Sequence, residues 1–150
     1  MQYLLDTSIC VFFLRGKLEL NEIVREKGRE NFYVSEITVL KLTYGAENSE
    51  NKIKSHQAVE DFLSGITIIP IFGVIKRYAV EKVRLRKLGK PANDNFDLLI
   101  GVTAIENELI LVTDNVKDFV LINGIQIENW FENFRKVTSY LIGNSGGLSI

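Results

Sequence analysis

Short apolar segments separated by helix-length stretches are the feature of this sequence that most constrains its fold. None of these segments shows a sustained alternation of apolar and polar residues, so each is expected to be buried on both faces. Strands of this kind belong to parallel sheets that lie between layers of helices. The sequence therefore predicts an α/β fold, with a central parallel sheet flanked by helices. The apolar segments are residues 2–5, 32–35, 66–70 and 109–112, and a short last strand is expected at 126–128.

The segments between the strands carry helix signals. Gly16, Gly28, Gly65 and Gly89 each follow a periodic stretch, as glycines at helix ends do. The stretch 97–107 is apolar nearly all round, which predicts a central, buried helix. The helices are expected at 8–15, 18–28, 38–46, 51–64, 73–88 and 97–107, with Thr38 as the start of the third.

Length and composition indicate one ordinary globular domain. The chain has 150 residues, of which 46% are hydrophobic and 25% charged, enough for one sizeable core. No apolar stretch approaches the roughly 20 residues that cross a bilayer, and no basic segment precedes an apolar one at the N-terminus. We expect a cytoplasmic protein without membrane contact. The domain is expected to cover residues 1–130, and residues 131–150 are interpreted as a tail that is either a short docking helix or flexible.

Oxygen-bearing side chains gather where the predicted strands end. Asp6 follows the first strand, Thr113 and Asn115 follow the strand at 109–112, and Asp97 opens the apolar helix. In open parallel sheets, ligands bind beyond the carboxyl ends of the strands. Converging carboxylates raise each other's pKa unless a cation lies among them, and Mg²⁺ or Mn²⁺ prefers such oxygen ligands. This pattern indicates metal-assisted hydrolysis of a phosphodiester.

Each of these residues also has a purely structural interpretation. Asp6 and Asp97 are both good helix N-caps, and taken alone Asp97 fits that role better than a catalytic one. Asp118 is more typical of a solvated turn or of a helix cap than of a metal ligand. Residues 76–90 carry seven Lys or Arg and one acid, Glu81, which is typical of the wet face of an amphipathic helix as well as of a nucleic-acid contact.

Four motifs in a fixed order run from about residue 3 to Trp130. They read LLDTSICVFFLRGK, VSEITVLKLTYGAENS, RLRKLGKPANDNFDLLIGVTAIENELILVTDNVKDF and GIQIENW. Together they resemble the PIN-domain ribonucleases and, more narrowly, the VapC toxins of bacterial type II toxin–antitoxin pairs. The resemblance covers nearly the whole chain apart from the tail, and it implies a PIN-like three-layer domain.

The resemblance also implies an activity, a cofactor and partners. It implies an endoribonuclease that uses Mg²⁺, or Mn²⁺, to cleave RNA, often tRNA, and that is neutralised by a cognate VapB-type antitoxin. A homodimer is implied as well. Carried over residue by residue, Asp6 and Asp97 are metal ligands, and Asn115 positions water or metal. The basic segment supplies the candidates for RNA phosphate contacts, which are Arg84, Arg86, Lys87 and Lys90.

Lys41 departs from the family pattern. A glutamate usually precedes the Tyr-Gly-Ala motif at this position, where it acts as a ligand or general base. With Thr38 as N-cap, a glutamate at 41 would also complete a capping box, so local structure gives no reason for a lysine. Three explanations stay open: a substitution engineered to disarm a toxin, a natural attenuated relative, or replacement of the missing carboxylate by Glu36.

In the first two cases, the Lys41 ammonium is expected near Asp6 and Asp97. There it would compete with Mg²⁺. The attraction between the ammonium and one carboxylate is about 4 kcal/mol at 4 Å and an effective dielectric constant of 20, before the cost of removing water from both groups is subtracted. The sequence therefore predicts a VapC-type endoribonuclease whose activity Lys41 impairs. The alternative is a catalytically inactive PIN scaffold that binds RNA or an antitoxin.

Overall fold

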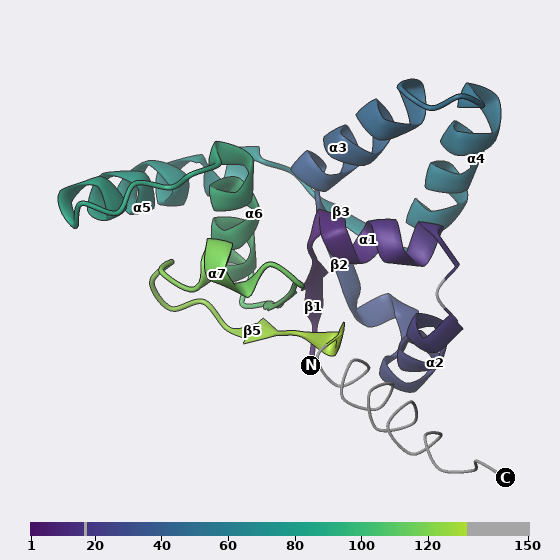
Figure 1. The fold of residues 1–150 in the computed structure, drawn as a ribbon. Coiled ribbons are helices and arrows are strands. Elements are labelled where there is room, and N and C mark those ends of the chain that lie inside the picture. The colour runs from purple at the N-terminus through teal and green to yellow at the C-terminus, as the bar shows by residue number, and fades with distance from the viewer. Residues whose placement is uncertain (17, 132–150) are drawn as a thin grey trace, which may run out of the picture.

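A five-stranded parallel sheet forms the centre of the fold (Figure 1). The computed structural model describes residues 1–16 and 18–131. The strands lie in the order β3-β2-β1-β4-β5, and every neighbouring pair is parallel, which confirms the predicted sheet. They are β1 (Tyr3–Leu5), β2 (Phe32–Ser35), β3 (Thr67–Ile69), β4 (Ile110–Val112) and β5 (Ile127–Glu128).

Helices cover both faces of this sheet, so the predicted three-layer arrangement is confirmed. In Figure 1 the first four helices lie on one side of β1 and the last three on the other, with α5 projecting as an arm. The helices are α1 (Thr7–Leu14), α2 (Leu18–Lys27), α3 (Glu36–Glu47), α4 (Lys52–Leu63), α5 (Ile75–Lys87), α6 (Asn95–Glu106) and α7 (Val116–Phe119).

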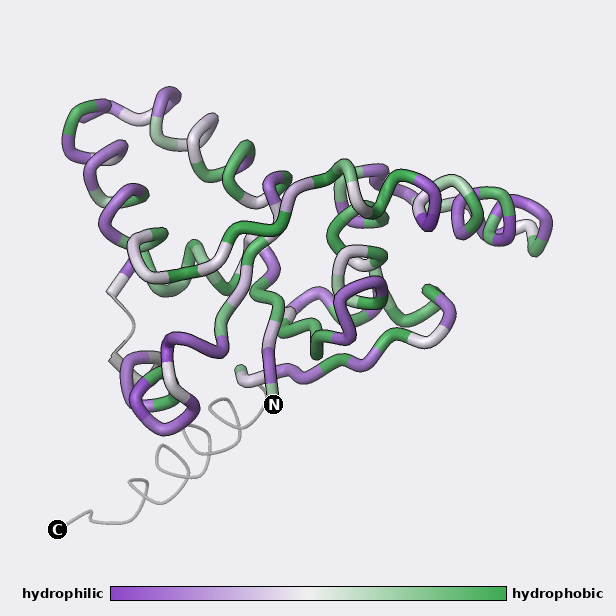
Figure 2. The backbone as a smooth tube through the Cα atoms, turned by 180° about the vertical axis from the view of Figure 1, so that it is seen from behind, coloured by the Kyte–Doolittle hydropathy of each residue, from purple (hydrophilic) through white to green (hydrophobic). Residues whose placement is uncertain are grey.

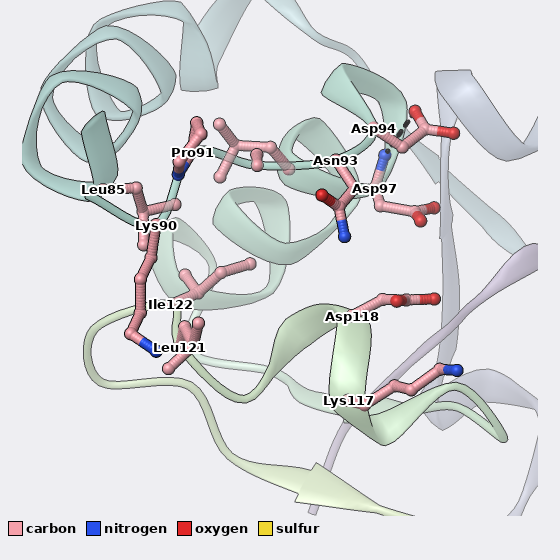
Figure 3. A pocket seen from close by; sticks show the side chains of 12 residues that line it. Leu85, Lys90, Pro91, Asn93, Asp94, Asp97, Lys117, Asp118, Leu121 and Ile122 are labelled. Atoms are coloured by element: carbon pink, nitrogen blue, oxygen red, sulfur yellow. Dashed lines mark hydrogen bonds between the residues drawn. The ribbon is translucent and has the colours of Figure 1, made fainter. Parts of the chain in front are cut away.

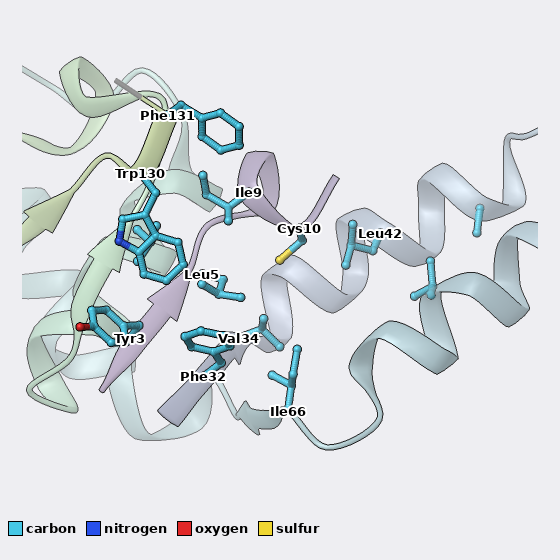
Figure 4. Close-up of a cluster of buried hydrophobic side chains, with 13 residues drawn as sticks. Tyr3, Leu5, Ile9, Cys10, Phe32, Val34, Leu42, Ile66, Trp130 and Phe131 are labelled. Carbon is cyan, nitrogen blue, oxygen red and sulfur yellow. The ribbon is translucent and has the colours of Figure 1, made fainter. Parts of the chain in front are cut away.

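Consecutive strand residues point into two separate cores, which explains why the strands lack polar alternation. Tyr3 and Leu5 of β1 belong to the core under α1–α4, whereas Leu4 packs with α5–α7. Figure 4 shows the first core, where the Trp130 ring lies with its centroid 5.3 Å from that of Tyr3 and 5.8 Å from that of Phe32. The Tyr3 pair is edge-on and the Phe32 pair is tilted, and aromatic pairs contribute about 0.5–1.5 kcal/mol each beyond burial. Strand β1 is thereby held rigidly at the point where the candidate site begins.

Helix α6 is the predicted central helix. Six of its residues between 98 and 104 are buried, and a methyl group at Gly101 would overlap the side chain of Ile122. A larger residue here would have to displace the Ile122 side chain, because the segment after α7 approaches the α6 backbone closely. Figure 2 shows the difference from α5, whose hydrophilic and hydrophobic residues alternate along an exposed helix. The buried α6 fixes the position of its first turn, where Asp97 lies.

The described part of the chain ends inside the first core. The ring of Phe131 packs on that of Phe12, with centroids 4.2 Å apart. The remaining residues of the expected tail, 132–150, lie outside the described residues. Within the described part, no helix is long and apolar enough to cross a membrane.

Candidate active site

Asp6 lies at the carboxyl end of β1 and caps α1. Its backbone is extended and one carboxylate oxygen, Oδ1, accepts a hydrogen bond from the Thr7 backbone N–H at 2.7 Å. The other oxygen, Oδ2, accepts from the Ser8 hydroxyl at 3.2 Å and from the Thr113 hydroxyl at 2.8 Å. The capping interpretation of Asp6 is therefore confirmed, and the same carboxylate also faces the end of β4.

The Asp6 carboxylate is almost completely buried, with 3% of the residue exposed. Burial raises its pKa above the usual range, and the hydrogen bonds from Thr113, Thr7 and Ser8 together with the charge of Lys41 offset only part of this effect. A buried charge of this kind is costly for the fold, so it is expected at a site with a chemical role.

Asp97 lies in the first turn of α6, but it is not the cap of that helix. Asp94 is the cap, because its Oδ1 accepts hydrogen bonds from the backbone N–H groups of Phe96 and Asp97 at 2.7 and 3.4 Å. The alternative that Asp97 serves as the N-cap is therefore wrong. The Asp97 carboxylate is left free to face the end of the sheet. Burial raises its pKa, Lys41 lowers it, and the charges of Asp6 and Asp94 raise it again.

Lys41 forms an ion pair with Asp97. The distance from Lys41 Nζ to Asp97 Oδ1 is 3.4 Å, and the two side chains are 27% and 22% exposed. The same ammonium lies 5.7 Å from the centroid of the Phe96 ring. The described residues show no ion pair between Lys41 and Asp6, although the positive charge of Lys41 lowers the pKa of Asp6. The predicted place of Lys41, close to the two aspartates, is thus observed most directly at Asp97.

The start of α3 differs from the sequence prediction. The helix begins at Glu36, and Ser35 caps it by accepting a hydrogen bond from the Ile37 backbone N–H at 3.1 Å. The predicted start at Thr38 is wrong because the cap lies at the strand end itself; Thr38 is buried inside the helix, and its hydroxyl contacts that of Thr7 at 3.2 Å. Lys41 therefore lies in the second turn and not at a capping-box position.

Glu36 does not replace the family glutamate. Its side chain is bound elsewhere, since Oε2 accepts a hydrogen bond from the backbone N–H of Ile71 at 2.8 Å. This contact ties the start of α3 to the segment after β3. The third explanation for Lys41, a carboxylate supplied by Glu36, is contradicted by this geometry.

Thr113 connects Asn115 to Asp6. The Thr113 hydroxyl is fully buried, donates to Asp6 Oδ2, and accepts a hydrogen bond from the Asn115 backbone N–H at 3.0 Å. Thr113, which the sequence places at the end of the strand at 109–112, is thus a hydrogen-bonding group within the site. Asn115 precedes α7, makes no side-chain cap bond and has an exposed side chain. Its backbone is thus fixed beside the site, while its amide is available to solvent.

The four predicted RNA contacts differ in their surroundings. Arg84 donates hydrogen bonds to the buried carboxylate of Glu81 and to the Leu121 carbonyl, the latter at 2.6 Å. Arg86 and Lys87 are exposed at the end of the helix, and Lys90 lines a cavity that Asp97 also lines. The structure therefore separates Arg84, which has a structural partner, from the other three predicted RNA contacts.

That cavity was not anticipated from the sequence. It has a volume of about 290 Å³ and lies beside Asp97, between the start of α6 and α7 (Figure 3). Asn93, Lys117 and Asp118 line it together with Lys90. The polar run before α6 was a visible signal, but only the position of α7 brings Lys117 and Asp118 to the same cavity. Asp118, interpreted from sequence as a turn or cap residue, is exposed on α7.

Comparisons with known proteins agree on one family. The model of the PIN domain matches residues 3–122. Ribonuclease VapC2 of Haemophilus influenzae is 35% identical over 139 residues, which cover 87% of this chain and 98% of the relative. The tRNA(fMet)-specific endonuclease VapC of Shigella flexneri is 29% identical over 134 residues, with the same coverage of both chains.

A solved structure of similar shape supports the same relationship. The DNA-bound VapBC of Salmonella typhimurium contains a chain that aligns with a TM-score of 0.80 at 28% identity. The alignment covers 87% of this chain and 98% of that chain.

Proposed function

This chain belongs to the PIN domain family and, within it, to the VapC-type ribonuclease toxins, and we propose that it is an RNA-cleaving toxin. We propose further that Lys41 prevents the acidic site of this toxin from binding a metal ion. The observation that carries this proposal is the ion pair between Lys41 Nζ and Asp97 Oδ1 at 3.4 Å. The ammonium occupies the position where a third acidic side chain is implied by the family, and it contacts one of the two aspartates that remain.

The residues present do not fit a divalent metal site. Among residues 1–16 and 18–131, no group of three or more His, Cys, Asp or Glu side chains is arranged to hold a metal ion. Asp6 has both carboxylate oxygens engaged by hydrogen bonds, and Asp97 faces a cation already. Mg²⁺ is usually bound through one or two carboxylates and keeps several waters, so the ammonium beside Asp97 opposes a metal here more than the number of carboxylates does.

The positive charge of Lys41 also offsets part of the negative charge that a metal ion would otherwise neutralise at Asp97. At 3.4 Å and an effective dielectric constant of 20, the attraction to Asp97 is about 5 kcal/mol before the loss of hydration is subtracted. Water screens part of this attraction because both side chains are about a quarter exposed. A divalent cation at Asp97 has to displace the ammonium or tolerate its repulsion. We therefore infer weak metal binding and slow cleavage of RNA for this chain.

The substrate we propose is RNA, with tRNA as the first candidate. The relatives from Shigella and Salmonella are named tRNA(fMet)-specific endonucleases, and they share about 30% of their residues with this chain. Arg86 and Lys87 are exposed and Lys90 borders the cavity beside Asp97, so these three cations are in a position to meet RNA phosphates.

The test is to restore a glutamate and to compare it with matched variants. Lys41→Glu replaces the ammonium by a carboxylate, Lys41→Gln only removes the charge, and Lys54→Glu makes the same charge change on an exposed residue of α4. Mg²⁺ and Mn²⁺ binding is measured by calorimetry, thermal unfolding is followed with and without metal, and cleavage is measured on total tRNA.

We expect only Lys41→Glu to bind metal tightly, to gain thermal stability from it and to cleave tRNA rapidly. A ligand at one hundred times its Kd stabilises the folded state by about 2.7 kcal/mol, so the metal-dependent shift is easily measured. Equal cleavage and equal metal binding by the parent and Lys41→Glu would overturn the proposed role of Lys41.

A second function is favoured by the same ion pair. With Lys41 at Asp97, the chain also fits an inactive PIN scaffold that binds RNA or an antitoxin without catalysis. Lys41→Glu separates the two functions. Absence of cleavage by this variant, with metal binding restored and RNA binding retained, would favour the scaffold.

We further propose an antitoxin partner and a homodimer. A cavity of about 420 Å³ lies between α1, α3 and α4 and borders Lys41; its apolar lining includes Val11, Leu42 and Val59. An antitoxin segment in this cavity would lie directly against the site. The Salmonella relative was crystallised as a VapBC assembly, which supports a partner of this kind. Co-purification with the product of a small adjacent gene, and the mass of the complex in solution, test both proposals.

A further inference from the structure

The cavity beside Asp97 has the size of a small-molecule site. Its volume of about 290 Å³ lies just below the range for ligand pockets, which is about 300–1,000 Å³. A single nucleotide fits such a space, whereas a duplex does not. Because Asp97 lines the cavity, a group bound there lies next to the candidate active site.

One wall of the cavity is apolar. Leu85, Leu98 and Ile122 are nearly fully buried and contribute to it, and Leu121 adds an exposed apolar side chain at the rim. Proteins that recognise single-stranded RNA, or that act on extruded bases, place flat base faces against surfaces of this kind. The wall therefore suits the face of one unstacked base.

The opposite side of the cavity carries polar groups that lack internal partners. In Figure 3 the Asn93 amide points into the space between α6 and α7, whereas the carboxylates of Asp97 and Asp118 both point away from Leu85 and Ile122. Within the described part of the chain, the side chains of Asn93, Asp118 and Lys117 make no hydrogen bond. These groups are free to bind a ligand, and an amide that donates and accepts at once matches the edge of a base.

We propose that this cavity binds one unstacked base of the RNA substrate, next to a phosphate that lies by the ion pair of Lys41 with Asp97. This inference rests on the proposed function, since it takes the substrate to be RNA. Asn93 contacts the edge of the base, and Leu121 and Ile122 contact its face. Lys90 and Lys117, at the two ends of the cavity, contact the flanking phosphates. Asn93 Oδ1 and the Asp118 carboxylate are acceptors, so bases with an exocyclic amino group are favoured over uracil.

The first experiment measures binding without catalysis. The isotope-labelled full chain is titrated with AMP, CMP, GMP, UMP and ribose 5-phosphate, and NMR follows the amide of Asn93 and the methyl groups of Leu121 and Ile122. We expect AMP, CMP and GMP to shift these signals with a Kd at least about threefold below that of UMP, which is within the contribution of one hydrogen bond. Ribose 5-phosphate should leave the methyl signals unchanged. Equal Kd values for all five compounds, or shifts confined to the lysines, would overturn the proposal.

Paired variants connect the binding to the cavity. Asn93→Ala removes the amide, and Leu121→Trp fills the space from its rim; Asn48→Ala and Ile53→Trp are matched controls at exposed positions that do not line the cavity. Thermal unfolding verifies that each variant folds. We expect the Kd for AMP to rise about fivefold in Asn93→Ala and binding to be lost in Leu121→Trp, with both controls unchanged. Unchanged AMP binding in both folded cavity variants would refute the assignment.

Cleavage in the Lys41→Glu background separates this inference from the proposed function. If that enzyme cuts tRNA and adding Asn93→Ala leaves its base preference unchanged, the base site is wrong while the ribonuclease assignment stands. If no variant cuts RNA but AMP still binds in the cavity with the expected selectivity, the base site stands and the ribonuclease assignment fails.

Discussion

Replacing Glu81 by Gln removes the charge that ties α5 to the segment after α7. Glu81 is 5% exposed, and its two carboxylate oxygens accept hydrogen bonds from Arg84 Nε at 3.0 and 3.1 Å. Oε1 also accepts from the Asn123 backbone N–H at 2.9 Å. The Arg84 guanidinium then donates to the Leu121 carbonyl. The carboxylate thus holds the wall of the cavity beside Asp97.

The expected cost follows from these bonds. A hydrogen bond to a charged group contributes about 1.5–3 kcal/mol and a neutral one about 0.5–1.5 kcal/mol. Gln keeps the shape and one acceptor oxygen but loses the charge, so Glu81→Gln should lower the free energy of unfolding by about 1–3 kcal/mol. For a chain of this length the melting temperature should fall by roughly 3–10 °C.

The effect should also depend on pH. Burial raises the pKa of Glu81, but the hydrogen bonds from Arg84 and Asn123 outweigh burial, and the pKa lies below its ordinary value of 4.5. A depressed pKa means that the stabilisation is complete above pH 4.5 and is lost as the pH falls through the folded-state pKa. Urea unfolding of the parent and Glu81→Gln, measured at neutral pH and at several acidic pH values, should show a difference that shrinks only in acid.

An exposed pair provides the control. Arg77 Nε lies 2.9 Å from Glu106 Oε2, with both side chains more than 40% exposed, so Glu106→Gln should change stability by less than about 0.5 kcal/mol. If Glu81→Gln is no more destabilising than Glu106→Gln at neutral pH, or if its effect persists unchanged in acid, the reasoning is refuted.

Two further predictions concern the site and the RNA contact. Burial raises the pKa of Asp6, so its contribution to stability is greatest below its ordinary pKa of 3.8 and is lost as the pH rises through the folded-state pKa. Asp6→Asn should therefore raise the melting temperature at neutral pH, and a fall there would contradict this prediction. Arg86→Ala combined with Lys87→Ala should weaken RNA binding and reduce the slope of log K against log salt by about 0.7 for each lost phosphate contact. An unchanged slope in anisotropy titrations would exclude these residues as phosphate contacts.

The strands and the layer order were predictable because strands that are buried on both faces consist of continuous apolar residues, without polar alternation. The segment 32–35 became β2 with the predicted bounds, and the other strands differ from their predicted bounds by one or two residues at most. The comparisons then confirmed the family that the motifs indicate. Asp6 and Thr113 lie together because parallel strands end at the same edge of the sheet, and this rule was available from the sequence.

Helix starts were less predictable because several capping residues lie next to one another. Ser35 and Thr38 both fit an N-cap, as do Asp94 and Asp97, and local propensity does not choose between them. In the structure the caps are Ser35 and Asp94, the first at the end of β2. The backbone partners of the Glu81–Arg84 pair were equally hidden, since the Asn123 N–H reaches Glu81 and the Leu121 carbonyl reaches Arg84 only through the packing of α7 on α6.

The two aspartates of the site depend on different surroundings, and this difference explains how the chain accommodates Lys41. Asp6 is held by the Thr7 backbone N–H and by the hydroxyls of Ser8 and Thr113, so its position requires neither a metal nor a lysine. For the Asp97 carboxylate, Lys41 is the only hydrogen-bond donor among the described residues. A change at position 41 therefore acts on Asp97 and leaves Asp6 in place. The fold preserves one half of the acidic site by itself, while the other half depends on which charge the second turn of α3 presents.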